Sequence, residues 1–216
     1  MYPYRCKRVM GYDIFDAQKK LKRKVIIKRD KFENIIEKTT YDGSNKLKAK
    51  YIYEMNKRGL LRRKIKFGSD GKTQCYFQYH YNEEWQLKEQ KKYTAKDILI
   101  KSNRFYFNNL GERIRKETFD AAGRLTKIIL YVFDSKNRRI RDYTLSEDGE
   151  ITKSTQYVYG AGNNIECIKY MNGLDSKQGT AKIIYGNDGD RIEKKRFDEK
   201  GALKSITKYH YLKTVY

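Results

Sequence analysis

Aromatic residues and methionines recur along the chain with a period of 26 residues. One series contains Phe15, Tyr41, Phe67, Tyr93, Phe119, Leu145, Met171 and Phe197. A second series contains Arg29, Met55, Tyr81, Phe107, Phe133, Tyr159, Tyr185 and Tyr211, and Arg29 is the only member of either series that is neither apolar nor aromatic. A repeat of this length defines an architecture, so we interpret the rest of the chain within this frame.

Turn-forming residues follow most members of the two series. Gly, Asn or Asp occupies the fourth following position at Asn45, Gly59, Gly71, Asp97, Gly111, Gly123, Asn137, Gly149, Asn163, Asp175, Gly189 and Gly201. These residue types tolerate positive φ, which suits a hairpin loop of about four residues that closes through a left-handed residue. Asp or Asn often follows the aromatic directly, as at Asp42 and Asp120, where its side chain can bond the backbone of the turn.

An aliphatic residue stands six or seven positions after many of the aromatics, for example at Leu21, Leu125 and Ile192. It begins the next strand and would pack against the aromatic across the hairpin. Each 26-residue unit is therefore predicted to hold two strands and two turns.

This pattern predicts an all-β fold, an antiparallel meander of about sixteen strands built from 26-residue two-strand repeats. We expect a single β-repeat domain of about eight repeats over residues 1–216, shaped as a long twisted or coiled repeat sheet. Neither end carries a cap, so we expect open strand edges that favour end-to-end addition. The loop over residues 171–179 is expected to replace the start of one strand.

The formal charge of +22 comes from 49 Lys and Arg against 27 Asp and Glu. Every second strand is basic through its middle, which makes a column of cations along the sheet. Two interpretations remain open, because such a column attracts polyanions, while a Lys-rich surface also keeps sheets from stacking edge to edge. The candidate residues for binding a polyanion or another partner are Arg62, Arg63, Lys64, Arg113, Arg115, Arg139, Arg141, Lys194 and Lys195.

One turn departs from the repeat. Glu83, Glu84 and Trp85 place two acids before the only Trp, which stands where other units have Gly, Asn or Asp. We keep this turn as a candidate contact site, with a tolerated sequence variant as the alternative.

No residue pattern for catalysis, cofactor binding or metal binding is found. His80 and His210 occupy equivalent repeat positions, and no P-loop, dinucleotide-binding or nucleophile-elbow motif is present. Cys6, Cys75 and Cys167 are odd in number and share no motif, so neither a disulfide framework nor a zinc site is expected. Cys75 lies in an apolar stripe and is predicted to be a buried free thiol.

No signal peptide or transmembrane segment is recognised in the sequence. We therefore expect a cytoplasmic protein if the chain is complete, and a surface or secreted protein if a leader was removed.

The segments Phe119-Asp-Ala-Ala-Gly-Arg-Leu-Thr126 and Tyr131-Val-Phe-Asp134 resemble the YD repeat of the Rhs family. Phe197-Asp-Glu-Lys-Gly-Ala-Leu203 and Tyr209-His-Tyr211 match next best, and a weaker likeness to MORN-type repeats exists. The Rhs resemblance implies long coiling β-sheets that build shells or scaffolds and that bind rather than catalyse.

These observations predict a non-enzymatic structural scaffold or protein-interaction module that self-assembles through its sheet edges. The alternative is a binder of nucleic acid or another anionic polymer through the basic strand middles. The expected partner is a protein or a second copy of the chain, as an oligomer or filament, and an anionic polymer comes second. We expect no cofactor, no small-molecule substrate and no membrane span.

Overall fold

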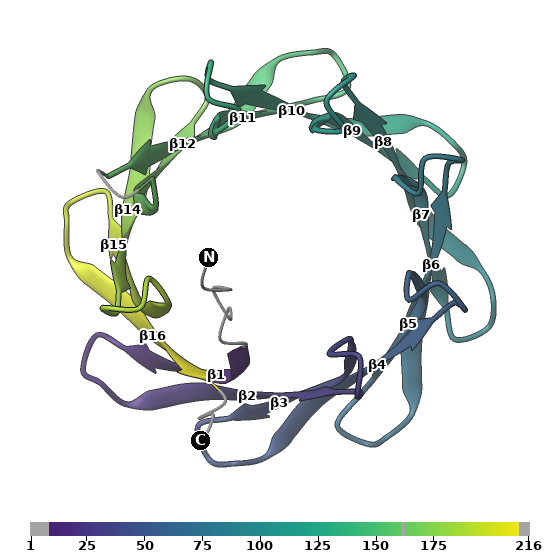
Figure 1. The fold of residues 1–216 in the computed structure, drawn as a ribbon, viewed down its shortest axis with the longest axis horizontal. Helices are drawn as coiled ribbons and strands as arrows, with labels where there is room; N and C mark the ends of the chain where they lie inside the picture. Colours follow the sequence, from purple (N-terminus) through teal and green to yellow (C-terminus); the bar gives the residue numbers. More distant parts are fainter. Residues whose placement is uncertain (1–8, 161–162, 212–216) are drawn as a thin grey trace, which may run out of the picture.

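A computed structural model describes residues 9–160 and 163–211. It holds sixteen strands: β1 Val9–Asp16, β2 Leu21–Arg29, β3 Ile35–Asp42, β4 Leu47–Met55, β5 Leu61–Phe67, β6 Thr73–Tyr81, β7 Leu87–Thr94, β8 Leu99–Phe107, β9 Arg113–Asp120, β10 Leu125–Phe133, β11 Arg139–Leu145, β12 Ile151–Tyr159, β13 Ile165–Asn172, β14 Ser176–Tyr185, β15 Arg191–Asp198 and β16 Leu203–Tyr211. Each strand pairs antiparallel with its neighbours in the chain, and β1 pairs with β16, which closes a barrel (Figure 1).

The predicted antiparallel meander of sixteen strands is confirmed, but the predicted open, coiled sheet is wrong. The two edges that were expected to be free pair with each other, with Tyr12 opposite Tyr209 and Asp16 opposite Ser205. The closed sheet therefore has no free edge to which a further copy of the chain could add.

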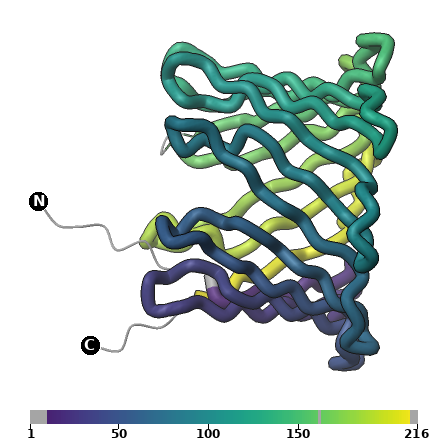
Figure 2. Tube along the Cα trace, turned by 90° about the vertical axis from the view of Figure 1, so that its right-hand side faces the viewer, coloured from purple at the N-terminus to yellow at the C-terminus, as the bar shows by residue number. Residues whose placement is uncertain are grey.

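A regular register step explains the closure. Lys38 of β3 faces Tyr51 of β4, which in turn faces Lys66 of β5. Lys66 lies 28 positions after Lys38, whereas the repeat is 26 residues, so each hairpin is staggered by two residues relative to the one before it. The stagger tilts the strands, as Figure 2 shows. A constant tilt combined with strand twist curves the sheet until its first and last strands meet.

The turns follow the predicted design. Eleven of the twelve predicted positions have positive φ, and at Asp120 the side chain accepts the N–H groups of Ala122 and Arg124 at 2.9 Å each. Asp175 is the exception, because the turn there is shorter and Gly173 takes the positive φ of 57°. The predicted loop over residues 171–179 is wrong for the same reason, since β13 and β14 extend into it and leave only residues 173–175 between them.

A β-bulge lies at a fixed place in the hairpins. The register shifts between Val132 and Phe133 of β10 where that strand meets β11, and equivalent shifts occur in the other hairpins. A tyrosine secures several of these bulges: the hydroxyl of Tyr159 donates to the carbonyl of Arg139 at 2.9 Å, and that of Tyr185 to the carbonyl of Ile165 at 2.9 Å. Bulges increase local twist, which helps the sheet to curve.

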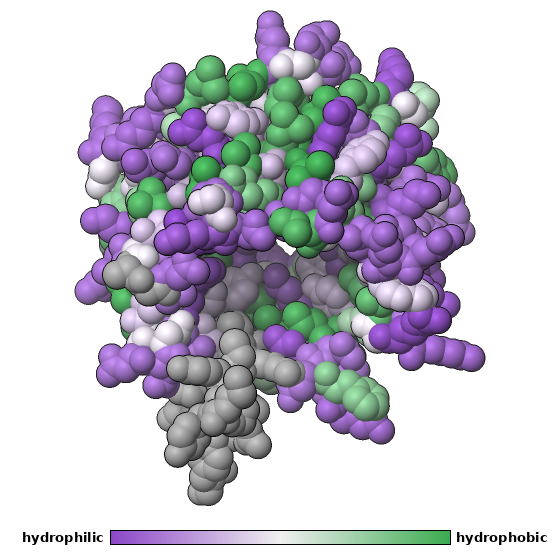
Figure 3. All heavy atoms as spheres, turned by 45° about the horizontal axis from the view of Figure 1, so that its top comes forward, coloured by the Kyte–Doolittle hydropathy of each residue, from purple (hydrophilic) through white to green (hydrophobic). Residues whose placement is uncertain are grey.

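Burial alternates along the strands and separates an inward face from an outward face. In β2, Val25 and Ile27 are 2% and 8% exposed, whereas Ile26 between them is 38% exposed. On the same face, Lys38 Nζ reaches across β2 to the hydroxyl of Tyr12 at 3.2 Å. The face that carries Val25 and Ile27 therefore lines the barrel, and Figure 3 shows a hollow behind its rim.

The inward face is only partly filled by apolar side chains. Ile168, Ala181 and Ile183 form a small buried cluster, with Tyr157 and Tyr170 packed against it. A closed barrel of sixteen strands is too wide for its own side chains to fill and leaves an aqueous channel. The interior is therefore a surface rather than a packed core.

Lys19→Gly should stabilise the fold, because Lys19 holds a φ of 62° that costs an L-residue about 1 kcal/mol. The matched change Gly123→Ala should destabilise it by a similar amount, since Gly123 has a φ of 82° and no atom lies within 4 Å of an added Cβ. Urea unfolding of both variants measures this, and a Lys19→Gly variant less stable than wild type would contradict the strain assigned to this turn.

Candidate functional site

Basic side chains dominate the inward face. The register that places Val25 and Ile27 inward also places eleven cations there: Arg23, Lys38, Lys64, Lys66, Lys92, Lys101, Lys116, Lys127, Lys153, Lys194 and Arg196. They come from both halves of the chain, and barrel closure brings them onto one concave surface. Within the described residues, none of the eleven forms an ion pair.

Among the described residues of this face, the acids at strand ends are in ion pairs: Asp16 with Lys22, Asp42 with Lys48, Asp120 with Arg124 and Asp198 with Lys204. Asp142 is the one acid in the described strand middles of this face, and it is also paired. Arg139 binds both of its carboxylate oxygens, and the hydroxyl of Tyr157 donates to Oδ2 at 2.7 Å. The guanidinium of Arg139 also stacks on Tyr131, with Cζ 4.3 Å from the ring centre. Asp142 therefore neutralises Arg139 and leaves the eleven inward cations uncompensated.

Most other acids in the strand middles lie on the outward face, in ion pairs. Glu37 binds Lys50 at 2.9 Å and Lys28 at 3.1 Å. The other outward pairs are Glu54–Arg62, Glu89–Lys91, Glu117–Arg115, Glu193–Lys195 and Asp13–His210. Within the described chain, the two faces of the sheet thus differ in how their cations are paired: several outward cations bind acids, although Lys24, Lys169 and Lys182 do not, whereas none of the eleven inward cations binds an acid.

The causes of the pKa shifts also differ between the two faces. Inside, burial is the main cause: it raises the pKa of Tyr53 to about 12 and lowers the pKa of the Lys64 and Lys116 ammonium groups. Outside, hydrogen bonds are the main cause: Lys50 lowers the pKa of Glu37 to about 2, and Glu117 raises the pKa of Tyr106. The inward side chains are therefore enclosed by the surrounding wall, whereas the outward ones respond mainly to their direct partners.

The nine basic residues named from the sequence do not form one column. Lys64 and Lys194 lie on the inward face, and the guanidinium groups of Arg113 and Arg139 stack on the inward aromatics Phe105 and Tyr131. The outward face holds Arg63, Arg115, Arg141 and Lys195, and Arg62 pairs with the outward acid Glu54. Neighbouring residues of a strand point to opposite faces, so a run of cations is divided between them.

Sequence reasoning missed most of the inward cations. Lys66, Lys92, Lys101, Lys127 and Lys153 were not named, although each lies two residues from another inward residue or opposite one across a ladder. The sequence contains a signal for them, because residues two positions apart in a strand share a face. Lys127, for example, shares the face of Ile129 and Tyr131 in β10.

The turn with Glu83, Glu84 and Trp85 keeps the ordinary turn geometry. Trp85 takes the left-handed position with a φ of 62°, and its N–H donates to the carbonyl of Asn82 at 3.1 Å. Its ring is 51% exposed, and Arg58 of the neighbouring hairpin stacks on it with Cζ 3.7 Å from the ring centre. The Trp therefore ties two hairpin tips together at one end of the barrel.

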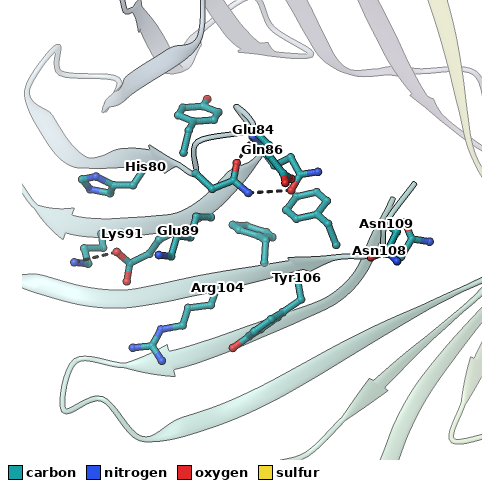
Figure 4. A pocket seen from close by; sticks show the side chains of 14 residues that line it. His80, Glu84, Gln86, Glu89, Lys91, Arg104, Tyr106, Asn108 and Asn109 are labelled. Carbon is teal, nitrogen blue, oxygen red and sulfur yellow. Dashed lines mark hydrogen bonds and ion pairs between the residues drawn. The ribbon is translucent and has the colours of Figure 1, made fainter. Parts of the chain in front are cut away.

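An outward hollow of about 1230 Å³ lies beside this turn, over β6, β7 and β8. Figure 4 shows His80, Glu89, Lys91, Arg104 and Tyr106 around it, with Glu84 and Gln86 at the turn. Its acids and bases are mixed, and Glu89 is paired with Lys91 at 3.1 Å. This hollow lacks the single-sign charge that distinguishes the interior.

Other kinds of site were sought in residues 9–160 and 163–211. Among them, no group of three or more His, Cys, Asp or Glu side chains could hold a metal ion. Cys75 is a buried free thiol, as predicted, and Cys167 is a half-buried free thiol. Cys6 lies outside the described residues. Within the same part of the chain, no helix has the length and apolar character needed to cross a membrane.

Comparison with known proteins gives a fold but no family. No protein-family model matches the chain, and no curated protein matches it. A porin-like protein from Bacteroides uniformis aligns over 96% of this chain and 99% of its own, with a TM-score of 0.63 and 9% sequence identity. At that identity the likeness shows a shared fold alone.

Two further solved structures align at lower similarity. A porin-like protein from Bacteroides vulgatus covers 96% of this chain and 100% of its own, with a TM-score of 0.46 and 13% identity. A TcdB2-TccC3 structure covers 96% of this chain and 14% of its own, with a TM-score of 0.36 and 10% identity.

Glu37→Gln should reduce the acid sensitivity of the fold. The pKa of Glu37 is about 2 in the folded protein against an ordinary 4.5, so its stabilising effect is complete above the ordinary value and is lost as the pH falls from about 4.5 to about 2. We expect the urea midpoint of the wild type to fall over this interval and that of the variant to fall less. Glu147→Gln, at an exposed turn residue, is the control. Equal effects of the two changes would contradict the role given to Glu37.

Proposed function

We propose that this chain is a non-enzymatic binding barrel whose inward face holds an anionic polymer. The observation that carries the proposal is the charge of that face, where, among the described residues, eleven cations in no ion pair stand against Asp142, which Arg139 binds, and four strand-end acids that are paired with other cations. Like charges gathered on one concave surface repel one another, and a polyanion relieves this repulsion. A surface lined by one sign of charge also concentrates counter-ions and speeds their association.

The dimensions suit a polymer chain. Sixteen tilted strands at about 4.8 Å spacing give roughly 30 Å between opposite backbones. Long side chains from both walls leave a bore of roughly 15 Å. Such a bore accepts an extended single chain and is narrower than a double helix. A polymer also matches the cations better than a small anion does, because they extend over strands from β2 to β15.

The outward face supports a barrel that is surrounded by water. A barrel in lipid presents an outward apolar band roughly 25 Å tall. Here the outward strand middles carry ion pairs, such as Glu37 with Lys28 and Lys50, and Glu193 with Lys195. We therefore place water on both faces.

The scaffold role expected from the sequence is the second candidate. Pairing of β1 with β16 removes the free sheet edges on which self-assembly was to depend. Contacts through exposed hairpin tips remain available to it, since Phe32, Trp85 and Leu110 are 74%, 51% and 68% exposed. All three lie in turns that follow even-numbered strands, and therefore at the same end of the barrel. The proposed kinship with Rhs-type repeats would support this role, because the resemblance implies shells or scaffolds.

Removal of inward charge should weaken polyanion binding and its salt dependence. The test variant is Lys66→Gln, Lys92→Gln and Lys127→Gln together, and the control is the outward triple Lys24→Gln, Lys169→Gln and Lys182→Gln. Both remove the same charge, and none of the six lysines is in an ion pair within the described chain. Fluorescence anisotropy with labelled heparin oligosaccharide and labelled oligothymidylate, from about 50 to 200 mM NaCl, gives the affinities.

The inward triple should lower the slope of log affinity against log salt by about 2 for the single strand, since each lost phosphate contact contributes roughly 0.7. The outward triple should bind almost as wild type does. Equal losses in both triples would place binding outside the barrel. Absence of binding to either polyanion, together with salt-insensitive self-association, would replace the proposal by the scaffold role.

A further inference from the structure

The repeats arrange the inward residues in level rings. A barrel closed from eight equivalent units has equivalent positions at one height, so inward residues 26 positions apart lie side by side around the bore. Six of the eight members of one ring are aromatic: Ile27, Tyr53, Tyr79, Phe105, Tyr131, Tyr157, Ile183 and Tyr209. The neighbouring ring contains four lysines and one acid: Tyr12, Lys38, Lys64, Gln90, Lys116, Asp142, Ile168 and Lys194.

The two rings interlock across the ladders. Tyr53 is opposite Lys64, and Phe105 is opposite Lys116, so an aromatic ring faces an ammonium group at these two places in the wall. Lys116 Nζ lies 5.9 Å from the centre of the Phe105 ring, within the range of a cation–π contact. At these places the wall therefore presents a flat aromatic surface and a positive charge on neighbouring strands.

These two features meet in a hollow of about 490 Å³ on the inward side of β1 to β5. Tyr12, Tyr51 and Tyr53 line it together with the cations Lys38, Lys64 and Lys66. Among the described residues, no carboxylate lines this hollow. The opposite wall differs, because the β11–β13 region contains the Asp142–Arg139 pair and the buried Ile168 cluster.

Lysine alone does not distinguish one polyanion from another, but lysine with aromatic rings does. Sulfated polysaccharides and polyphosphate use only the charge, whereas single-stranded nucleic acid also stacks its bases on aromatic side chains. Building on the proposed function, we infer that the anionic polymer is single-stranded nucleic acid, with bases against the ring that contains Tyr53 and Tyr79 and phosphates on Lys38, Lys64 and Lys66. The width of the bore excludes a duplex from this position.

The test compares strands that carry equal charge. An oligothymidylate of about 12 nucleotides and an abasic strand of the same length differ only in their bases. We expect the oligothymidylate to bind at least about ten-fold more tightly, since each stacked base contributes substantially to affinity. A duplex of equal length should bind more weakly than the single strand at the same salt.

Variants identify the rings responsible. Tyr53→Leu with Tyr79→Leu should weaken oligothymidylate binding about ten-fold while leaving abasic-strand binding and the salt slope unchanged. Tyr53→Phe with Tyr79→Phe keeps both rings and should bind as wild type does. The outward pair Tyr41→Leu with Tyr143→Leu is the matched control and should have no effect. Circular dichroism melts confirm that each variant is folded.

The outcomes separate this inference from the proposed function. Equal affinity for the abasic strand and the oligothymidylate, with heparin bound as well, would overturn the nucleic-acid inference and leave an unselective polyanion barrel. A duplex that binds as tightly as the single strand would overturn it too. Binding of none of these polymers would remove the proposed function itself.

Discussion

The ladder between β1 and β16 is the constraint on which the rest of the structure depends. It joins the two ends of the described chain, and the side chains of His210 and Asp13, 197 positions apart, bond across it at 3.1 Å. Closure gives the sheet one concave face and one convex face, which an open meander lacks. Cations from strands far apart in the sequence then share a single enclosed surface, where their fields add instead of being screened separately.

The hairpin unit makes this closure possible with local interactions alone. Each turn is fixed by an Asp or Asn side chain and a left-handed residue, and each bulge adds twist at the same place. The two-residue stagger between Lys38, Tyr51 and Lys66 repeats in every unit, so a small local offset accumulates around the barrel. Few large apolar side chains are buried, and stability therefore depends on ladders and turns more than on a packed core.

The sequence allowed the strands and turns to be predicted because both are determined within a few residues. Asp120 and Gly123, for example, specify their turn without help from distant parts of the chain. Closure could not be predicted from the 26-residue period alone, since it depends on the pairing register. Across two ladders, Lys38 is aligned with Lys66, 28 residues on, and not with Lys64, 26 residues on. The curvature then decides which face is enclosed.

The sequence indicated which strand middles are basic but not which face each cation occupies, for the same reason. A basic strand middle such as Arg63-Lys64 was recognised, yet its two side chains lie on opposite faces and do different things. Arg63 stacks on the outward Tyr76, whereas Lys64 lies over Phe77 inside the bore. Lysines outside the obvious runs, such as Lys101 and Lys153, become part of the site only once the barrel curves them inward.

The number of repeats also determines the width of the bore. The diameter of a β-barrel rises with the number of its strands, and each 26-residue unit supplies two of them. Duplication or deletion of one unit would leave the remaining turns and ladders intact. It would change the strand number by two and the diameter of the channel accordingly. A barrel with one unit more or fewer would therefore enclose a channel of a different width while using the same hairpin unit.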